Sequence, residues 1–140
     1  MPSKNSCYTY FEIIGKFPPE EITRRLGLDP QECRRAGDLR KNGTAHEEAS
    51  WTYGRCDDYD VDTGVQMRKT IADLLDKIDA LNAIRADYDV RFFLEVVPSL
   101  YCGEIAPCLA PPPDVIDFCH ATRTEMDIDL YLYEMNDQEN

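Results

Sequence analysis

Residues 7–27, CYTYFEIIGKFPPEEITRRLG, join a strand pattern to a helix pattern. Residues 7–14 are rich in aromatic and β-branched side chains and end before a glycine, which favours a β-strand. Pro18 and Pro19 suit the first positions of a helix, and Gly27 is a natural residue just after the end of one. The stretch therefore predicts a strand followed by a helix of about two turns.

The same order recurs later in the chain, where RFFLEVVP at 91–98 precedes PPDVIDFC at 112–119. Alternation in the second strand predicts that its core-facing residues are Val90, Phe92, Leu94 and Val96. In the second proline-opened helix, the residues expected to point inward are Val115, Ile116 and Cys119. Two such strand–helix units suggest one sheet with helices packed on it.

The segment between these units predicts a strand and a long helix. ASWTYGR at 49–55 favours a short strand around Trp51 and Tyr53. Apolar residues then recur at three- and four-residue steps, which predicts one amphipathic helix over about 64–86. Its apolar face comprises Met67, Ile71, Leu74, Leu75, Ile78 and Leu81. The stretch 103–109 leaves room for an extra short strand.

The closing stretch MDIDLYLY at 126–133 alternates strictly, as a half-buried strand does. The alternation predicts that Met126, Ile128, Leu130 and Leu132 face the core, whereas Asp127, Asp129, Tyr131 and Tyr133 face away. Strands that alternate argue against a doubly wound sheet. We predict a single α+β domain over 1–140, a ferredoxin-like two-layer sandwich in which helices cover one face of a mixed or antiparallel sheet. Residues 1–6 and 134–140 are expected to be flexible tails.

Several of these features resemble a known family. The stretch YFEIIGKFPPEEITRRLGLDP at 10–30, Gly37-Asp38, Trp51, the long helix and the closing DIDLYLY together resemble the bacterial domain of unknown function 4279. The resemblance covers residues 7–133. It implies no catalytic residue, because none is established for the family, and it implies that Gly37, Asp38 and Trp51 are determinants of the fold. The proline-rich connection at 107–113 departs from the family pattern and leaves the last crossover open.

The composition limits the classes of partner. The formal net charge is −12, and the last sixteen residues carry six acids and no base. Binding to nucleic acid or to anionic lipid needs a cationic surface, so we expect neither partner. The sequence has no run of about 18 apolar residues and no export signal, which predicts a cytoplasmic protein that does not span a membrane. The six cysteines are accordingly expected to be reduced, buried thiols.

The stretch DDYDVDTGVQM at 57–67 invites comparison with a calcium loop. Counted from Asp58, the position that requires glycine holds Thr63, and the position of the bidentate glutamate holds Lys69. A lysine there would repel the ion. We therefore interpret the stretch as a helix start in which Asp62 or Thr63 is the cap.

No other pattern indicates chemistry. The cysteines lack the paired spacing of zinc sites, and the neighbouring Cys119 and His120 would point about 100° apart on a helix. His46 and His120 are the only histidines, and neither lies in a nucleophile motif. The basic run at 24–41 is interleaved with acids, which is typical of a solvated surface. We predict no metal, no cofactor and no catalytic residue.

The face of the sheet that lacks helices is the feature that bears on function. On it the closing strand's Asp127, Asp129, Tyr131 and Tyr133 would lie beside Tyr8, Tyr10 and Glu12, or beside Arg91, Phe93 and Glu95. Exposed aromatic patches usually mark interfaces. The leading hypothesis is a non-enzymatic cytoplasmic binding protein with an acidic surface, of the immunity or inhibitor type, which binds a basic protein partner through this face.

Other interpretations remain open. The face is instead covered if residues 31–50 fold over it or if the protein self-associates through it. A small-molecule-binding or regulatory module is the alternative function, and it predicts an apolar pocket between sheet and helices. An enzyme would require a cleft that holds His46 or His120 beside a cysteine or a carboxylate.

Overall fold

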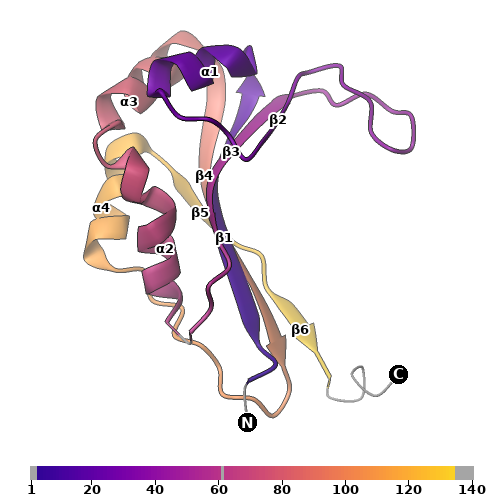
Figure 1. The fold of residues 1–140 in the computed structure, drawn as a ribbon, viewed down its shortest axis with the longest axis vertical. Helices are drawn as coiled ribbons and strands as arrows, with labels where there is room; N and C mark the ends of the chain where they lie inside the picture. The colour runs from indigo at the N-terminus through magenta and orange to yellow at the C-terminus, as the bar shows by residue number, and fades with distance from the viewer. Residues whose placement is uncertain (1–2, 61, 135–140) are drawn as a thin grey trace.

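The protein was analysed as a computed structural model, which describes residues 3–60 and 62–134. Strands and helices are interspersed along the chain, as Figure 1 shows. The elements are β1 (Ser6–Lys16), α1 (Pro19–Leu26), β2 (Glu32–Arg34), β3 (Ala49–Cys56), α2 (Thr63–Ile71), the 3₁₀ turn η1 (Ala72–Leu74), α3 (Ile78–Asp87), β4 (Asp89–Tyr101), α4 (Pro113–Thr122), β5 (Glu125–Ile128) and β6 (Tyr131–Tyr133).

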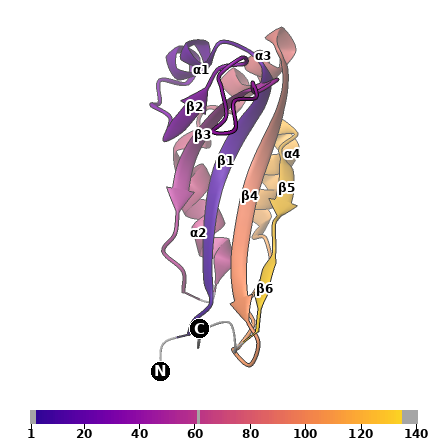
Figure 2. The same cartoon turned by 90° about the vertical axis from the view of Figure 1, so that its right-hand side faces the viewer.

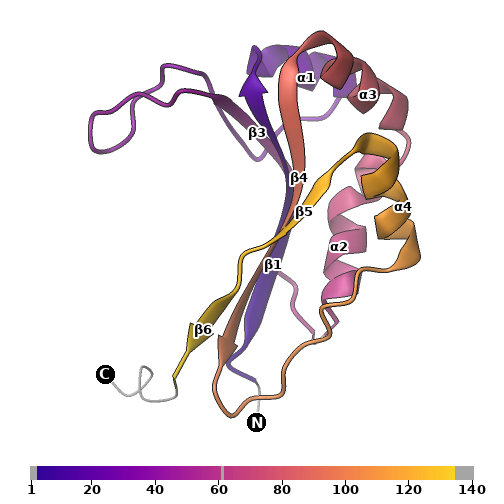
Figure 3. The same ribbon diagram turned by 180° about the vertical axis from the view of Figure 1, so that it is seen from behind.

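The strands form one mixed sheet in the order β2-β3-β1-β4-β5, and β6 pairs with the far end of β4. β1 is antiparallel to both β3 and β4, whereas β4 is parallel to β5 and β6. All four α-helices lie on the same side of the sheet, in Figure 1 and from behind in Figure 3. The predicted α+β class, with a mixed sheet and helices on one face, is confirmed. The ferredoxin-like arrangement is not established by this strand order.

The core lies between the helices and the inner face of β1, β3 and β4. Phe11 is at its centre, with its ring 5.7 Å from that of Phe92 and 6.2 Å from that of Phe118. Trp51 is fully buried, and its indole Nε1 donates a hydrogen bond to Thr23 Oγ1 at 3.1 Å. The expected alternation of β4 is confirmed, because Val90, Phe92, Leu94 and Val96 are all buried.

Gly37 and Asp38 shape the base of an arm, residues 35–48, that extends away from the sheet (Figure 1). Gly37 has a φ of 94°, which side chains rarely adopt, and its N–H donates to the His46 carbonyl at 2.8 Å. The Asp38 carboxylate accepts from the Arg35 N–H at 2.8 Å. These two residues therefore determine local structure in the arm and are not part of the core.

The prediction of one long helix over 64–86 is wrong. The helix stops at Ile71, tightens into η1, and α3 begins at Ile78 after the Lys77 N–H donates to the Leu74 carbonyl at 2.9 Å. α2 packs on β1 and β3, whereas α3 packs on β4. Because sheets twist, two short segments follow this surface where one straight helix would not. The break turns Leu75 out to solvent.

The prediction of one continuous closing strand is also wrong, because β5 ends at Ile128 and β6 begins at Tyr131. The Asp129 N–H donates to the Val96 carbonyl at 2.8 Å. The backbone groups of Val96 in β4 therefore point toward the closing stretch. The backbone of Pro98, two residues later in β4, points toward the same stretch, but proline has no N–H to donate to it. Pairing resumes only where Ser99 meets Tyr131. The proline in β4 thus divides its partner strand in two.

Several residues expected in the core are exposed, and one expected element is missing. Val115 and Cys119 are buried as predicted, but Ile116 is exposed and Phe118 takes its place. In the closing stretch only Met126 packs against the core, whereas Ile128, Leu130 and Leu132 are exposed. Within the described residues, the stretch 103–109 forms no strand and holds only an isolated bridge from Cys108 to Asp62.

The predictions for the cysteines and for the two tails are confirmed only in part or lie outside the described residues. All six cysteines are free thiols, but only Cys7 and Cys119 are buried, so the expectation of buried thiols is wrong for the others. Asn5, placed in the predicted N-terminal tail, is buried and donates from its amide Nδ2 to the Ile105 carbonyl at 2.9 Å. Most of the predicted C-terminal tail, residues 135–140, lies outside the described residues.

Candidate functional site

The helix-free side of the sheet, which Figure 2 views directly, carries most of the predicted site residues. Cross-strand register aligns Tyr10 of β1 with Glu95 of β4, and Glu95 with Asp127 of β5. Because side chains alternate between the two faces of a strand, residues paired in this way lie on the same face. A phenol and two carboxylates therefore form a row across three strands. We call this side of the sheet the open face.

Glu95 is the most unusual residue of the row, since its side chain is acidic and yet the residue is only 8% exposed. Burial, then a hydrogen bond with Asp127 and the charges of Asp127, Glu12 and Asp129, raise the pKa of Glu95 to about 8. Burial and the neighbouring Glu12 and Glu95 also raise the pKa of Tyr10 well above its usual range. Near neutral pH, Glu95 is thus mainly protonated, because its surroundings disfavour another negative charge.

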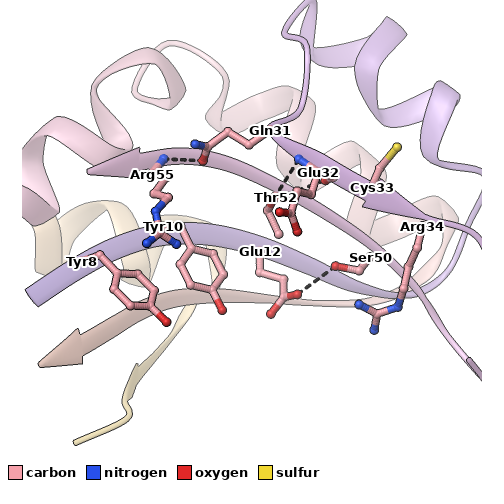
Figure 4. A pocket seen from close by; sticks show the side chains of 10 residues that line it. All are labelled: Tyr8, Tyr10, Glu12, Gln31, Glu32, Cys33, Arg34, Ser50, Thr52 and Arg55. Carbon is pink, nitrogen blue, oxygen red and sulfur yellow. Dashed lines mark hydrogen bonds between the residues drawn. The ribbon is translucent and has the colours of Figure 1, made fainter. Parts of the chain in front are cut away.

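Tyr8 and Glu12 extend the row along β1. The rings of Tyr8 and Tyr10 stack with centroids 6.0 Å apart, and the Arg55 guanidinium lies 3.9 Å from the centroid of the Tyr8 ring. The Ser50 hydroxyl donates to the Glu12 carboxylate at 2.8 Å. Figure 4 shows these side chains on one surface, with Arg55 above the tyrosines and Glu12 beside Ser50. The site is thus held in place by the strands themselves.

A groove of about 470 Å³ runs beside these residues, between β1, β3 and the short edge strand β2. Arg34 lies at one end of the groove and Arg55 near the other, with Glu12 between them (Figure 4). The Arg34 Nε is buried and has no hydrogen-bond partner. Residues 31–34 therefore flank the open face, and the exposed arm that follows them stands away from it (Figure 1).

The predicted residues of β6 lie on the same face, farther along the sheet. Tyr131 pairs with Ser99 and Tyr133 with Tyr101, and the Tyr101 and Tyr133 rings stack with centroids 4.9 Å apart. Both β6 tyrosines are exposed, and the Tyr131 hydroxyl donates to the Asp129 carboxylate at 3.2 Å. That contact, together with the charges of Tyr8 and Tyr133, raises the pKa of Tyr131. All seven predicted residues thus lie on one continuous face.

The acidic side chains of the open face differ from those held in ion pairs elsewhere, such as Asp114, which pairs with Arg68 at 3.0 Å. Among the described residues, no ion pair includes any of the four open-face carboxylates, which are Glu12, Glu95, Asp127 and Asp129. Because Glu95 is mainly protonated near neutral pH, the negative charge of the open face comes chiefly from Glu12, Asp127 and Asp129.

Sequence reasoning found the β1 side of the groove, Tyr8, Tyr10 and Glu12, but missed the residues on its other side. Arg34 belongs to a basic run that looked like an ordinary solvated surface, and Arg55 and Ser50 gave no signal in the sequence. Only the pairing of β2 with β3 brings Arg34 near Ser50. Glu95 was placed on the right face, but nothing in its local sequence indicates burial.

The stretch with the calcium-loop spacing forms a helix cap. Asp62 accepts a hydrogen bond from the Gly64 N–H at 2.9 Å, and Lys69 forms an ion pair with Asp58 at 3.0 Å. Across residues 3–60 and 62–134, no group of three histidine, cysteine or acidic side chains is arranged to hold a metal ion. His46 lies in the arm and His120 on α4, so the structure places the two histidines on separate elements.

None of the helices in the described part of the chain has the length and apolar character needed to cross a membrane.

Comparisons with other proteins agree with the resemblance seen in the sequence. No curated protein and no solved structure matches this chain. A family model described as Domain of unknown function (DUF4279) matches residues 5–133, nearly the whole chain, and the protein therefore belongs to that family.

Proposed function

We propose that this protein is a non-enzymatic binding module that docks a basic protein partner on its open face. The observation that carries the proposal is the group of four acidic side chains on the open face, none of which is in an ion pair among the described residues, set among exposed tyrosines. An immunity-type or inhibitor-type protein that neutralises a cationic partner would need such a surface. The free thiols are typical of a reducing compartment and support a cytoplasmic location.

The chemistry of the row suits a lysine or arginine side chain. A cation placed between Glu95 and Asp127 would replace the proton that they share, because a nearby positive charge favours the ionised carboxylates. Arg55 already lies 3.9 Å from the centroid of the Tyr8 ring, which shows that the tyrosines of this face suit a guanidinium group. Binding is therefore expected to weaken with added salt and to release a proton near neutral pH.

A charge-matched pair of variants tests the proposal. The double variant Glu12→Gln with Asp127→Asn removes two charges from the open face, and the double variant Asp76→Asn with Asp79→Asn removes two exposed charges from the helix side. With fluorescent oligolysine as the probe, anisotropy should show affinity falling about tenfold for the first variant and less than about twofold for the second. Equal losses would mean that net charge alone attracts the probe, and would overturn the proposal.

The groove favours small-molecule binding as a second candidate. Arg34 offers a buried guanidinium nitrogen without a partner, which is the geometry that a carboxylate or phosphate ligand satisfies. This groove lies on the open face, not between sheet and helices as an apolar pocket would. An anionic metabolite that raises the melting temperature of the protein, but not that of Arg34→Ala, would favour this function.

A further inference from the structure

The strands β5 and β6 form a free edge of the sheet. β5 is the last strand in the sheet order, and β6 pairs only with β4. The Asp129 N–H donates to Val96, and the Tyr133 carbonyl accepts from Cys102 at 2.9 Å, so the odd-numbered residues direct their backbone groups inward. By alternation, Ile128, Leu130 and Leu132 direct theirs outward. Such a row of backbone donors and acceptors is a template for another strand.

The side chains along this edge differ between the two faces of the sheet: they are apolar on the helix side and acidic on the open face. On the helix side lie the apolar residues that the sequence places in the core and the structure leaves exposed, which are Ile116, Ile128, Leu130 and Leu132. A groove of about 850 Å³ adjoins them between α4 and β5, where Ile116 and Met126 form part of its wall. On the opposite side lie Asp127 and Asp129. The edge is thus apolar on one side and acidic on the other.

A strand added to this edge would extend the sheet and present side chains on both of its faces. Its alternate side chains would point into the groove beside α4, and the others would point over the acidic open face. The segment that fits therefore alternates apolar and basic residues. A second copy of the chain fits less well, because pairing two of these edges would place the acidic open faces of two chains of charge −12 side by side.

We infer that the free edge of β5 and β6 binds an extended basic segment of the partner as an additional strand. The inference rests on the proposed function, and it adds the mode of recognition. Backbone pairing supplies affinity, while the exposed apolar side chains of the helix side and the two aspartates of the open face select the alternating pattern. The edge carries neither lysine nor proline, the residues that usually protect an exposed strand from pairing.

Two peptides of identical composition test the inference. The first is Lys-Val-Lys-Val-Lys-Val-Lys, and the second has its lysines in one block and its valines in another. Isothermal titration with the full chain should give an affinity at least about tenfold higher for the alternating peptide. The Leu130→Pro variant, which removes an outward N–H but leaves the Asp129 contact with Val96, should abolish that preference.

A second variant tests the same edge in case Leu130→Pro does not fold. Ile128→Lys with Leu132→Lys places repulsive charge on side chains that are already exposed, and should lower affinity for the alternating peptide about tenfold. The control is Leu39→Lys with Leu75→Lys, two exposed leucines away from this edge, which should change affinity less than about twofold.

Each remaining outcome is decisive. Equal binding of the two peptides, unaffected by Leu130→Pro and weakened by Glu12→Gln with Asp127→Asn, would overturn the added strand and leave the proposed function standing. No binding of either peptide at low salt would overturn both. Dimerisation of the free protein that Leu130→Pro abolishes would show that the edge pairs with a second copy, which contradicts the inference.

Discussion

Leu94 in the middle of β4 and Leu132 in β6 occupy equivalent positions in strands that alternate in the same way, yet Leu94 is fully buried and Leu132 is 73% exposed. Both face the helix side of the sheet. The helices cover the sheet over β1, β3 and the first part of β4, but β6 extends beyond them (Figure 1). Alternation therefore identifies the face to which a side chain points, whereas burial depends on which element covers that face.

The largest expected effect comes from making the same substitution at both positions. Leu94→Ala should lower the free energy of unfolding by about 2–5 kcal/mol, because it opens a cavity in a packed core. Leu132→Ala should change it by less than about 0.5 kcal/mol, because the side chain is already in water. Urea denaturation measures both values. Similar losses for the two variants would show that β6 is covered in solution and would remove the distinction.

Glu95→Gln tests the electrostatics at the centre of the open face. The raised pKa means that the folded protein keeps a proton that the unfolded chain releases, so Glu95 destabilises the fold increasingly as pH rises from about 4.5 to about 8. The variant should match the wild type below pH 4.5. It should be more stable than the wild type above pH 8, and the difference in the free energy of unfolding should grow as pH rises from about 4.5 to about 8. A difference that does not depend on pH would contradict the account.

Thr70→Val should have an intermediate effect, since it removes polar contacts inside the core. The Thr70 hydroxyl donates to the Gly54 carbonyl at 2.7 Å and lies 2.7 Å from the Thr9 hydroxyl, which joins α2 to β3 and β1. Leaving these buried groups without partners should cost about 1–2 kcal/mol in thermal or urea unfolding. Thr70→Ser keeps the hydroxyl and loses the methyl group, so it is the matched control and should retain most of this stability. A loss in Thr70→Val no larger than that in Thr70→Ser would mean that these hydrogen bonds contribute little.

The smallest effect is expected for Asp114→Asn at the start of α4. Its carboxylate pairs with Arg68 at 3.0 Å, but both side chains are half exposed, and water screens such pairs. The free energy of unfolding should fall by less than about 1 kcal/mol, and added salt should reduce the difference. A larger decrease in the free energy of unfolding that salt does not reduce would contradict this expectation. It would mean that the contact between α2 and α4 depends on this ion pair.

The sequence predicts the local features of this fold well. The strand–proline–helix units at β1–α1 and β4–α4, the glycine that ends α1 and the Asp62 cap are all present, because each depends on residues close together in the chain. The faces of β1 and β5 also follow from alternation, which is why the row of Tyr10, Glu95 and Asp127 assembles from strands distant in sequence.

The features that the sequence does not reveal depend on distant partners. The break between β5 and β6 follows from Pro98 in a neighbouring strand, and the break between α2 and α3 follows from the shape of the sheet beneath them. The groove beside Arg34 exists only once β2, β3 and β1 are aligned, and the burial of Glu95 requires β1 and β5 on either side of β4. Periodicity within one segment contains no information about these neighbours.

The central claim is that the open face and its edge, and not the acidic surface as a whole, receive a basic partner. Backbone amide chemical shifts of the isotopically labelled protein, titrated with Lys-Val-Lys-Val-Lys-Val-Lys, test it most directly. The account predicts that the shifts change along β1, β4, β5 and β6, centred on Glu95, Asp127 and Leu130. Changes spread evenly over the exposed acids of the helix side, such as Asp76 and Asp79, or confined to them, would contradict it.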